Sequence, residues 1–274
     1  MSQDAVDVLP DVQHLVTEDD TPVDNLPSEK QQRLLTEPLY SSWAGPGAGR
    51  SFLAAANVGI FAQARQPAIV PDMFLSLDVE IAADWWRKEH RSYFMWEFGK
   101  PPELVLEIVS NTVGGENDRK KDTYARMGAD YYVVYDPLLQ VMAEVLTVFR
   151  LSARRYTHQR QARFPALHLG LTLWDGVFEE RQDTWLRWTD AQGVLIPTGK
   201  ERADAAAQQA AQADQRATEA DQRADEERQR ATEADQRADE ERQRADEERQ
   251  RADEADQRAE RLAALLRQAG INPQ

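Results

Sequence analysis

The chain has 274 residues, of which 33 are basic and 48 are acidic, for a formal net charge of −15. Cysteine is absent, which excludes disulfide bonds and thiolate metal sites. The acidic N-terminus lacks the apolar core of a signal peptide, and no apolar segment reaches the roughly 20 residues that cross a bilayer. We therefore expect a cytoplasmic protein without a membrane partner.

Charge is distributed unevenly along the chain. Residues 1–49 carry 2 basic and 9 acidic residues, residues 50–199 carry 17 and 19, and residues 200–274 carry 14 and 20. Affinity for nucleic acid depends on local positive charge that displaces counterions. Since no segment has a basic excess, any binding of DNA would depend on a local site and not on an extensive basic patch.

Composition divides the chain into three parts. Residues 1–49 predict an acidic arm with a short helix near residues 29–40, and residues 50–199 predict the folded domain. All seven tryptophans lie in these two parts, and no aromatic residue follows them. Residues 200–274 are rich in Ala, Glu, Asp, Gln and Arg and predict a long charged helix over residues 200–268.

Five apolar runs predict the strands of the domain, most of them bounded by Gly, Pro, Asp or Asn. They are residues 51–61, 71–79, 103–110, 130–136 and 142–151. The third run is apolar at most positions other than Glu103 and Glu107, which is typical of a central strand buried on both faces. Residues 82–100 contain six Phe, Tyr and Trp side chains, and their pattern allows either a helix or an aromatic loop near the site.

A helix is predicted between the third and fourth runs, over residues 114–128. Tyr124 and Met127 lie on one face of it, and Gly128 is placed for a left-handed C-terminal cap. Strand, helix and strand at this spacing indicate a right-handed crossover between two strands of one sheet.

The C-terminal segment repeats every seven residues. One heptad position is always alanine, from Ala217 to Ala259, and the position three residues later holds alanine or glutamate until Leu262. Such a seam is much poorer than the Leu and Ile seam of a stable coiled coil. Favourable i, i+4 pairs, each contributing about 0.2–0.5 kcal/mol, are Glu226–Arg230, Glu240–Arg244, Glu247–Arg251 and Glu254–Arg258. Three interpretations stay open: a solvated single helix, an Ala-rich coiled coil that forms a homodimer through residues 200–268, and a partner-binding helix.

Two carboxylates and a lysine form the candidate site. Asp72 begins an apolar run, Glu107 lies inside the central strand, and Lys120 falls on the following helix. A buried carboxylate is strongly unfavourable unless it is paired or binds a cation. Two carboxylates on neighbouring strands suit Mg²⁺, and a lysine beside them can orient or deprotonate a water and offset phosphate charge. Spacing alone fits a simple buried ion pair between Glu107 and Lys120 equally well.

A combined pattern surrounds these residues: Pro-Asp before a strand, a strand ending in Glu-Ile-Val-Ser, a helix with Lys four residues before Tyr, then Gly, and a strand ending in Asp-Pro. Its parts are Pro71-Asp72, Glu107-Ile108-Val109-Ser110, Lys120 with Tyr124, Gly128 and Asp136-Pro137. In this pattern the chain resembles the Uma-two (Uma2) family of bacterial endonucleases, within the PD-(D/E)XK restriction-endonuclease-like superfamily. The resemblance covers roughly residues 20–197, and the Ala-rich tail resembles one subgroup.

The resemblance implies an α/β fold of the restriction-endonuclease type, with a mixed sheet, flanking helices and an appended C-terminal helix. It also implies hydrolysis of DNA phosphodiester bonds that depends on Mg²⁺ or Mn²⁺. Asp72 and Glu107 would be catalytic metal ligands, and Lys120 would be the catalytic residue that positions the attacking water. Lys121 is a weaker rival, since it lies one residue off the pattern.

The chain departs from the superfamily in two places. The usual lysine lies two residues after the Glu, where this chain has Val109, so Lys120 must reach back from the helix. Many members also have an acidic residue on the first helix, for which Asp24 and Glu29 are candidates. Two alternatives to the nuclease therefore stay open. One is a non-catalytic scaffold that keeps the nuclease fold and uses the C-terminal helix for oligomerisation or partner docking. The other is DNA binding without cleavage.

Overall fold

The structure is a computed structural model that describes residues 25–47, 49–110 and 116–268. The chain divides into two compact units, Met1–Asp204 and Ala205–Gln274. The division into an arm, a domain and a helix, expected from composition, stays a prediction.

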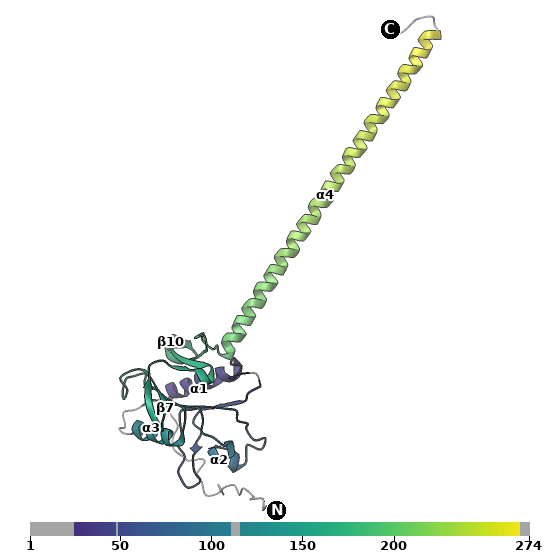
Figure 1. The fold of residues 1–274 in the computed structure, drawn as a ribbon. Coiled ribbons are helices and arrows are strands. Elements are labelled where there is room, and N and C mark those ends of the chain that lie inside the picture. The colour runs from purple at the N-terminus through teal and green to yellow at the C-terminus, as the bar shows by residue number, and fades with distance from the viewer. Residues whose placement is uncertain (1–24, 48, 111–115, 269–274) are drawn as a thin grey trace, which may run out of the picture. The chain divides into compact units, whose positions relative to one another are not determined.

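Figure 1 labels the main elements of both units. In chain order the elements are α1 (Leu26–Ser41), β1 (Phe52–Ala55), β2 (Ile60–Phe61), β3 (Met73–Leu77), η1 (Lys88–His90), β4 (Tyr93–Phe94), α2 (Met95–Phe98), β5 (Leu104–Ile108), α3 (Glu116–Met127), β6 (Tyr131–Tyr135), β7 (Leu146–Ser152), β8 (Arg155–Gln159), β9 (Arg163–Phe164), η2 (Pro165–Leu167), β10 (Leu169–Phe178), β11 (Arg181–Asp190) and α4 (Gly199–Gln268). Each of the five predicted runs contains a strand, and the first contains two. Strands β8 to β11 were not predicted, because strands with an exposed face carry polar residues that break up an apolar run.

The first helix begins earlier than predicted, at Leu26, because a capping residue precedes it. The Asn25 side chain accepts a hydrogen bond from Ser28 N at 3.0 Å, which satisfies one of the unpaired N–H groups of the first turn. Leu35 and Leu39 of this helix belong to the domain core. The helix is therefore packed into the first unit.

The main sheet is mixed and has six strands in the order β1-β3-β5-β6-β7-β8. Strands β5 and β6 are parallel neighbours, and the other adjacent pairs are antiparallel. The predicted helix, α3, connects β5 to β6, as a parallel pair requires. It ends as predicted at Gly128, which has a φ of +97° and donates its N–H to Tyr124 O at 3.0 Å. The expected α/β fold, with a mixed sheet and flanking helices, is confirmed.

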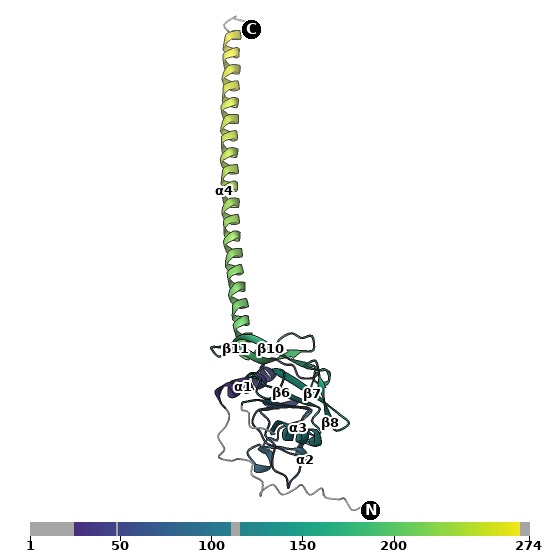
Figure 2. The same ribbon diagram turned by 90° about the vertical axis from the view of Figure 1, so that its left-hand side faces the viewer.

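Side-chain alternation along the strands separates two hydrophobic clusters. Leu104, Leu106 and Ile108 face the cluster that contains α1 and the small sheet of β9, β10 and β11. Val105 and Val109 face the cluster that contains Tyr124 of α3. Figure 2 shows α1 and α3 on opposite sides of the sheet. Because successive side chains of a strand point to opposite faces, Glu107 must share the α3 face with Val105 and Val109.

The aromatic segment of residues 82–100 is neither one helix nor an irregular loop. It contains η1, the two-residue strand β4 and the one-turn helix α2, and β4 pairs in parallel with β2. Tyr93 and Phe94 are buried, whereas Trp85 and Trp86 are 56% and 75% exposed.

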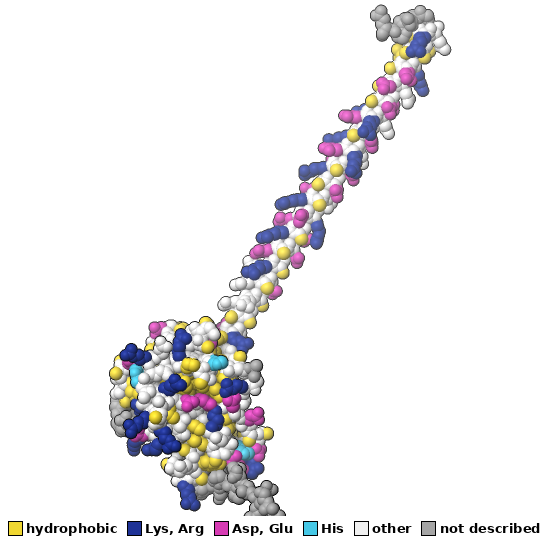
Figure 3. All heavy atoms as spheres, viewed as in Figure 1, with side chains coloured by type: hydrophobic (Ala, Val, Ile, Leu, Met, Phe, Trp, Pro, Cys, Tyr) yellow, Lys and Arg dark blue, Asp and Glu magenta, His cyan; other side chains and the backbone are white. Residues whose placement is uncertain are grey.

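Helix α4 contains 70 residues, so its length is on the order of 100 Å. None of its side chains is buried among those that the structure describes. Its four predicted i, i+4 ion pairs are present, with N···O distances of 3.7, 4.0, 3.7 and 3.1 Å. Figure 3 shows cationic and anionic side chains alternating along it. Over the described part of the chain, no helix combines the length and the apolar character that crossing a membrane requires.

The start of α4 is fixed by a capping box within the first unit. Glu201 N donates to Thr198 Oγ1 at 3.1 Å, and Thr198 N donates to Glu201 Oε2 at 2.7 Å. Glu201 also accepts two hydrogen bonds from the guanidinium of Arg187, at 2.8 and 2.6 Å. Arg187 is only 3% exposed, so Glu201 supplies the counter-charge that its burial requires.

Candidate active site

Asp72 and Glu107 face each other across neighbouring strands. Strand β3 pairs with β5 in an antiparallel register in which Met73 lies opposite Leu106. Continuing this register by one residue places Asp72 opposite Glu107, on the face covered by α3. Directly opposed residues of an antiparallel pair have Cβ atoms about 4.5–5.5 Å apart. The pair of carboxylates expected on neighbouring strands is therefore brought together.

Asp72 is held by donors from two other elements. Its Oδ2 accepts the backbone N–H of Ile108 at 2.6 Å, and its Oδ1 accepts Nε2 of Gln32 at 3.0 Å. The first bond ties the start of β3 to the end of β5. The second ties it to α1, which lies on the opposite side of the sheet from α3. Both bonds fix the direction in which the carboxylate points.

Glu107 is 3% exposed and receives two donors from α3. Lys120 Nζ donates to its Oε2 at 2.8 Å, and the Tyr124 hydroxyl donates to its Oε1 at 2.6 Å. Lys120 and Tyr124 are four residues apart and therefore lie on the same face of the helix. Lys120 does reach back to the strand. Tyr124 is fully buried and also donates a hydrogen bond to the carboxylate.

Burial raises the pKa of the Glu107 carboxyl, against the charge of Lys120 and the hydrogen bonds from Lys120, Tyr124 and Asp72, which all act to lower it. The pKa of Tyr124 is raised well above its ordinary value, first by burial and then by the charge of Glu107. Tyr124 therefore stays protonated and remains a donor. Two carboxyl groups within hydrogen-bonding reach of each other either share a proton or bind a cation between them.

Lys121, the rival lysine, points elsewhere. Its Nζ lies 3.5 Å from the centroid of the Phe149 ring, in a cation–π contact with strand β7. Val109, at the position of the superfamily's usual lysine, is 7% exposed and belongs to the α3-side cluster. Of these three positions, Lys120 is the one that contacts Glu107.

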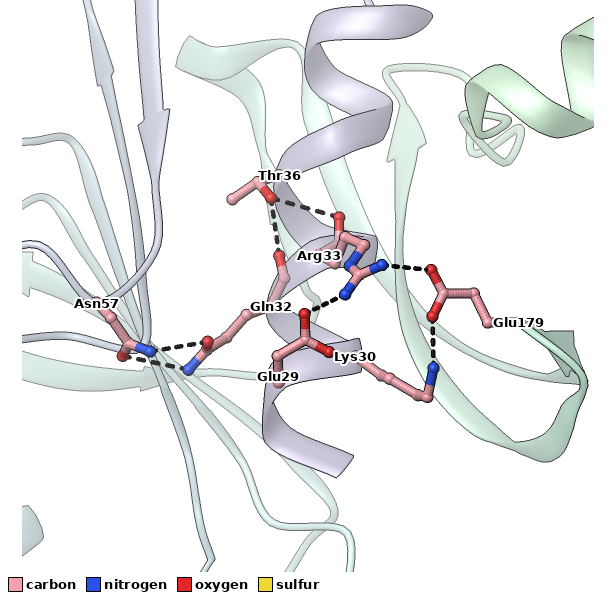
Figure 4. A network of polar contacts seen from close by, with 7 residues as sticks. All are labelled: Glu29, Lys30, Gln32, Arg33, Thr36, Asn57 and Glu179. Carbon is pink, nitrogen blue, oxygen red and sulfur yellow. Dashed lines mark hydrogen bonds and ion pairs between the residues drawn. The ribbon is translucent and has the colours of Figure 1, made fainter. Parts of the chain in front are cut away.

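Glu29, the acidic candidate that lies within the described residues, pairs with a residue outside the site. Asp24 lies outside those residues. Glu29 forms an ion pair with Arg33, which in turn binds Glu179 in the turn between β10 and β11. Figure 4 shows Arg33 and Glu179 on one side of α1 and Gln32 on the other.

Gln32 is the residue of α1 that reaches the site, although it was not among the site residues predicted from the sequence. It is 5% exposed, donates to Asp72, and exchanges two hydrogen bonds with the Asn57 amide, at 3.0 and 3.3 Å (Figure 4). A glutamine beside the buried leucines of a helix was the available signal, because a buried amide needs partners.

The donor set fits a divalent cation. Each of the four carboxylate oxygens of Asp72 and Glu107 accepts a hydrogen bond, and because a carboxylate oxygen has two lone pairs, a hydrogen-bonded carboxylate can also coordinate a cation. Within the described residues, no three His, Cys, Asp or Glu side chains are grouped as metal ligands. Mg²⁺ is commonly held by one or two carboxylates and several waters, which matches a two-carboxylate site.

The region of the chain that carries this site matches a known protein family. The Uma2 family, described as "Putative restriction endonuclease", matches residues 19–176, which is more than half of the chain. The chain belongs to the Uma2 family. The matched region of this Uma2 chain includes Asp72, Glu107 and Lys120, together with α1, β3, β5 and α3. The restriction-endonuclease-like superfamily generally uses divalent metal ions. No curated protein matches the chain.

Proposed function

We propose that this Uma2 chain is an endonuclease that hydrolyses DNA phosphodiester bonds with Mg²⁺ or Mn²⁺. The observation that carries the proposal is the convergence of a buried carboxylate, a facing carboxylate and a lysine, with Lys120 Nζ 2.8 Å from Glu107. Family membership and the suitability of the two-carboxylate donor set for Mg²⁺ support it.

In this proposal Asp72 and Glu107 hold the metal ion. When bound, the ion would polarise a phosphoryl oxygen and lower the pKa of a bound water. Lys120 donates a hydrogen bond that positions the attacking water and offsets the negative charge that develops on the phosphate oxygens. The water oxygen forms a bond to phosphorus while one ester P–O bond breaks, and the proton that the water gives up to solvent is matched by the proton that the leaving oxygen takes up.

Three further groups act through these residues. Tyr124 fixes the orientation of the Glu107 carboxylate, since it donates to the oxygen that Lys120 does not contact. Gln32 and the Ile108 N–H do the same for Asp72. Each of these contacts reduces the motion of a metal ligand, which keeps the site organised before substrate binds.

The test is cleavage of supercoiled plasmid DNA by the full chain with Mg²⁺ or Mn²⁺, with EDTA as the metal-free control. We expect Asp72→Ala and Glu107→Gln to lower the rate by on the order of 100-fold or more. Glu97→Gln, which alters an exposed carboxylate of α2, is the matched control and should cleave like the wild type. Equal activity in all four proteins would overturn the site assignment.

A non-catalytic scaffold is the second candidate. It is favoured by the fact that Lys120 and Tyr124 already satisfy both oxygens of Glu107, as a structural ion pair would require. Calorimetry with Mg²⁺ and Mn²⁺ separates the two functions. Absence of binding to a folded chain would support the scaffold, whereas binding that Asp72→Ala abolishes would support the nuclease.

A further inference from the structure

A cleft of about 590 Å³ opens beside Lys120, between α3 and the loop of residues 62–69. Lys120 connects the candidate active site to the cleft, because its ammonium contacts Glu107 and its side chain lines the cleft. Arg119, Thr123 and Arg126 of α3 form the same wall as Lys120, and the loop adds the amides of Gln63 and Gln66.

The charged side chains among the described lining of the cleft are all basic. Arg119, Lys120 and Arg126 supply three cations, and none of its described lining residues is acidic. Arg126 Nη2 donates to Thr123 Oγ1 at 3.1 Å, which holds its guanidinium along the cleft wall. In Figure 3, Lys and Arg side chains gather over the part of the domain where Figure 1 draws α3. This concentration contrasts with a net charge of −15 for the whole chain.

The positions of the two arginines on α3 give the distance along the cleft that they span. Arg119 and Arg126 are seven residues apart, or roughly 10 Å along the helix axis. One strand of duplex DNA advances only about 3.4 Å along its axis per phosphate. The two arginines are therefore far enough apart to contact different phosphates of one strand, and Lys120 lies beside the first of them.

We propose that this cleft, defined by Arg119, Lys120, Thr123, Arg126 and residues 62–69, binds backbone phosphates of one DNA strand beside the scissile bond. The inference rests on the proposed nuclease function and names how that site receives its substrate. Guanidinium groups donate two parallel hydrogen bonds to phosphate, and the Gln amides add neutral donors. Contacts of this kind position a strand without reading its bases, so binding is independent of sequence.

The binding arm of the test uses the full chain in EDTA, where the metal-dependent reaction cannot proceed. A short fluorescein-labelled duplex is titrated at NaCl concentrations between about 50 and 200 mM. Arg119→Gln/Arg126→Gln is compared with Arg155→Gln/Arg160→Gln, which removes the same charge from exposed residues in and next to β8. We expect the cleft variant to bind about tenfold more weakly at the lowest salt, with a log K against log salt slope less negative by about 1.8. The β8 variant should retain both the affinity and the slope.

A conservative variant separates charge from loss of structure. Arg119→Lys/Arg126→Lys keeps both charges, so it should keep the wild-type salt slope while losing the paired hydrogen bonds of the guanidinium groups. Equal affinity and slope for the wild type and the Gln variant would overturn the inference. An equal loss in the β8 variant would also overturn it, because binding would then follow net charge alone.

The plasmid assay distinguishes failure of this inference from failure of the proposed function. If the cleft variant cleaves with a raised KM and little change in kcat, the cleft inference and the proposed nuclease function both stand. If the cleft variant binds and cleaves like the wild type, the cleft inference fails and the nuclease stands. If the wild type binds through the cleft but makes no product with Mg²⁺ or Mn²⁺, the cleft inference stands and the nuclease fails.

Discussion

Lys120 Nζ lies 2.8 Å from Glu107 Oε2, although the two residues are 13 positions apart and belong to different elements. The chain leaves β5 directly after Ile108, and α3 then packs over the face of the sheet to which Glu107 points. A lysine on the helix can therefore contact a carboxylate in the strand. Val109 meanwhile fills the strand position of the superfamily's lysine with a core side chain.

Replacing Lys120 and Lys121 separately should show which of the two neighbouring lysines belongs to the site. We expect Lys120→Gln to slow plasmid cleavage by about 100-fold, because it removes the positioned cation. Lys121→Gln should leave cleavage unchanged and should lower the free energy of unfolding by about 0.5–1 kcal/mol, through loss of the contact with Phe149. Cleavage rates and urea unfolding measure the two effects. The reverse ranking in cleavage would identify Lys121 as the site lysine.

Removing one hydroxyl tests the role of Tyr124. Tyr124→Phe keeps the buried ring but leaves Glu107 with one donor fewer, so we expect the free energy of unfolding to fall by about 1–3 kcal/mol. Cleavage should slow by about 10–100-fold, since a metal ligand is less well oriented. Tyr156→Phe is the matched control. It loses a hydroxyl bond to Ala129 O at 2.8 Å and should cleave normally. Unchanged cleavage by Tyr124→Phe would limit Tyr124 to a packing role.

The hydrogen bond from Gln32 of α1 to Asp72 predicts that loss of the Gln32 side chain weakens metal binding. Gln32→Ala removes a donor to Asp72 Oδ1, and we expect Mg²⁺ or Mn²⁺ to bind about 10–100-fold more weakly. Glu29→Gln alters a residue of the same helix that pairs with Arg33 instead, so its metal affinity should match the wild type. Isothermal titration calorimetry measures both. Equal metal affinities for the two variants would show that Gln32 does not contribute to metal binding.

The ion pair of Arg187 with Glu201 predicts how stability depends on pH. Burial acts to raise the pKa of Glu201, but hydrogen bonds from Arg187 and Thr198 outweigh it, and the pKa is lowered overall. A carboxyl with a lowered folded-state pKa stabilises the fold above its unfolded pKa, and this contribution is lost as pH falls through the folded pKa. The wild type should therefore exceed Glu201→Gln in stability at neutral pH, and the difference should shrink below pH 4.5, the ordinary pKa of Glu201.

Tryptophan fluorescence can follow this unfolding in urea at neutral and acidic pH. It reports on the domain alone, because all seven tryptophans precede α4. A difference between Glu201→Gln and the wild type that stays constant across this pH range would contradict the assignment.

The long helix predicts an oligomeric state. Its heptad seam holds Ala and Glu, and its exposed leucines, Leu262 and Leu265, lie near its C-terminal end. We therefore expect α4 to be a single solvated helix. In sedimentation experiments, the full chain and a chain ending at Asp204 should both be monomers. Truncation at Gly199 is unsuitable, because it would remove Glu201 and leave Arg187 buried without its counter-charge. A dimer formed by the full chain alone would instead establish the homodimer through residues 200–268.

Features that depend on local spacing could be predicted from the amino-acid sequence. Apolar runs located the central strands, the Lys120 and Tyr124 spacing predicted a shared helix face, and the i, i+4 pairs predicted the ion pairs of α4. A lone carboxylate in an apolar strand marked Glu107, because burial demands a partner whatever the fold.

Long-range packing selects which side chains become partners. Gln32 reaches Asp72 across 40 residues, and Arg187 meets Glu201 because the end of β11 packs against the start of α4 within the first unit. The choice of Lys120 over Lys121 depends on how α3 is rotated against the sheet. Periodicity fixes the face on which a side chain lies, but the element that covers that face is set by long-range packing, which no local pattern encodes.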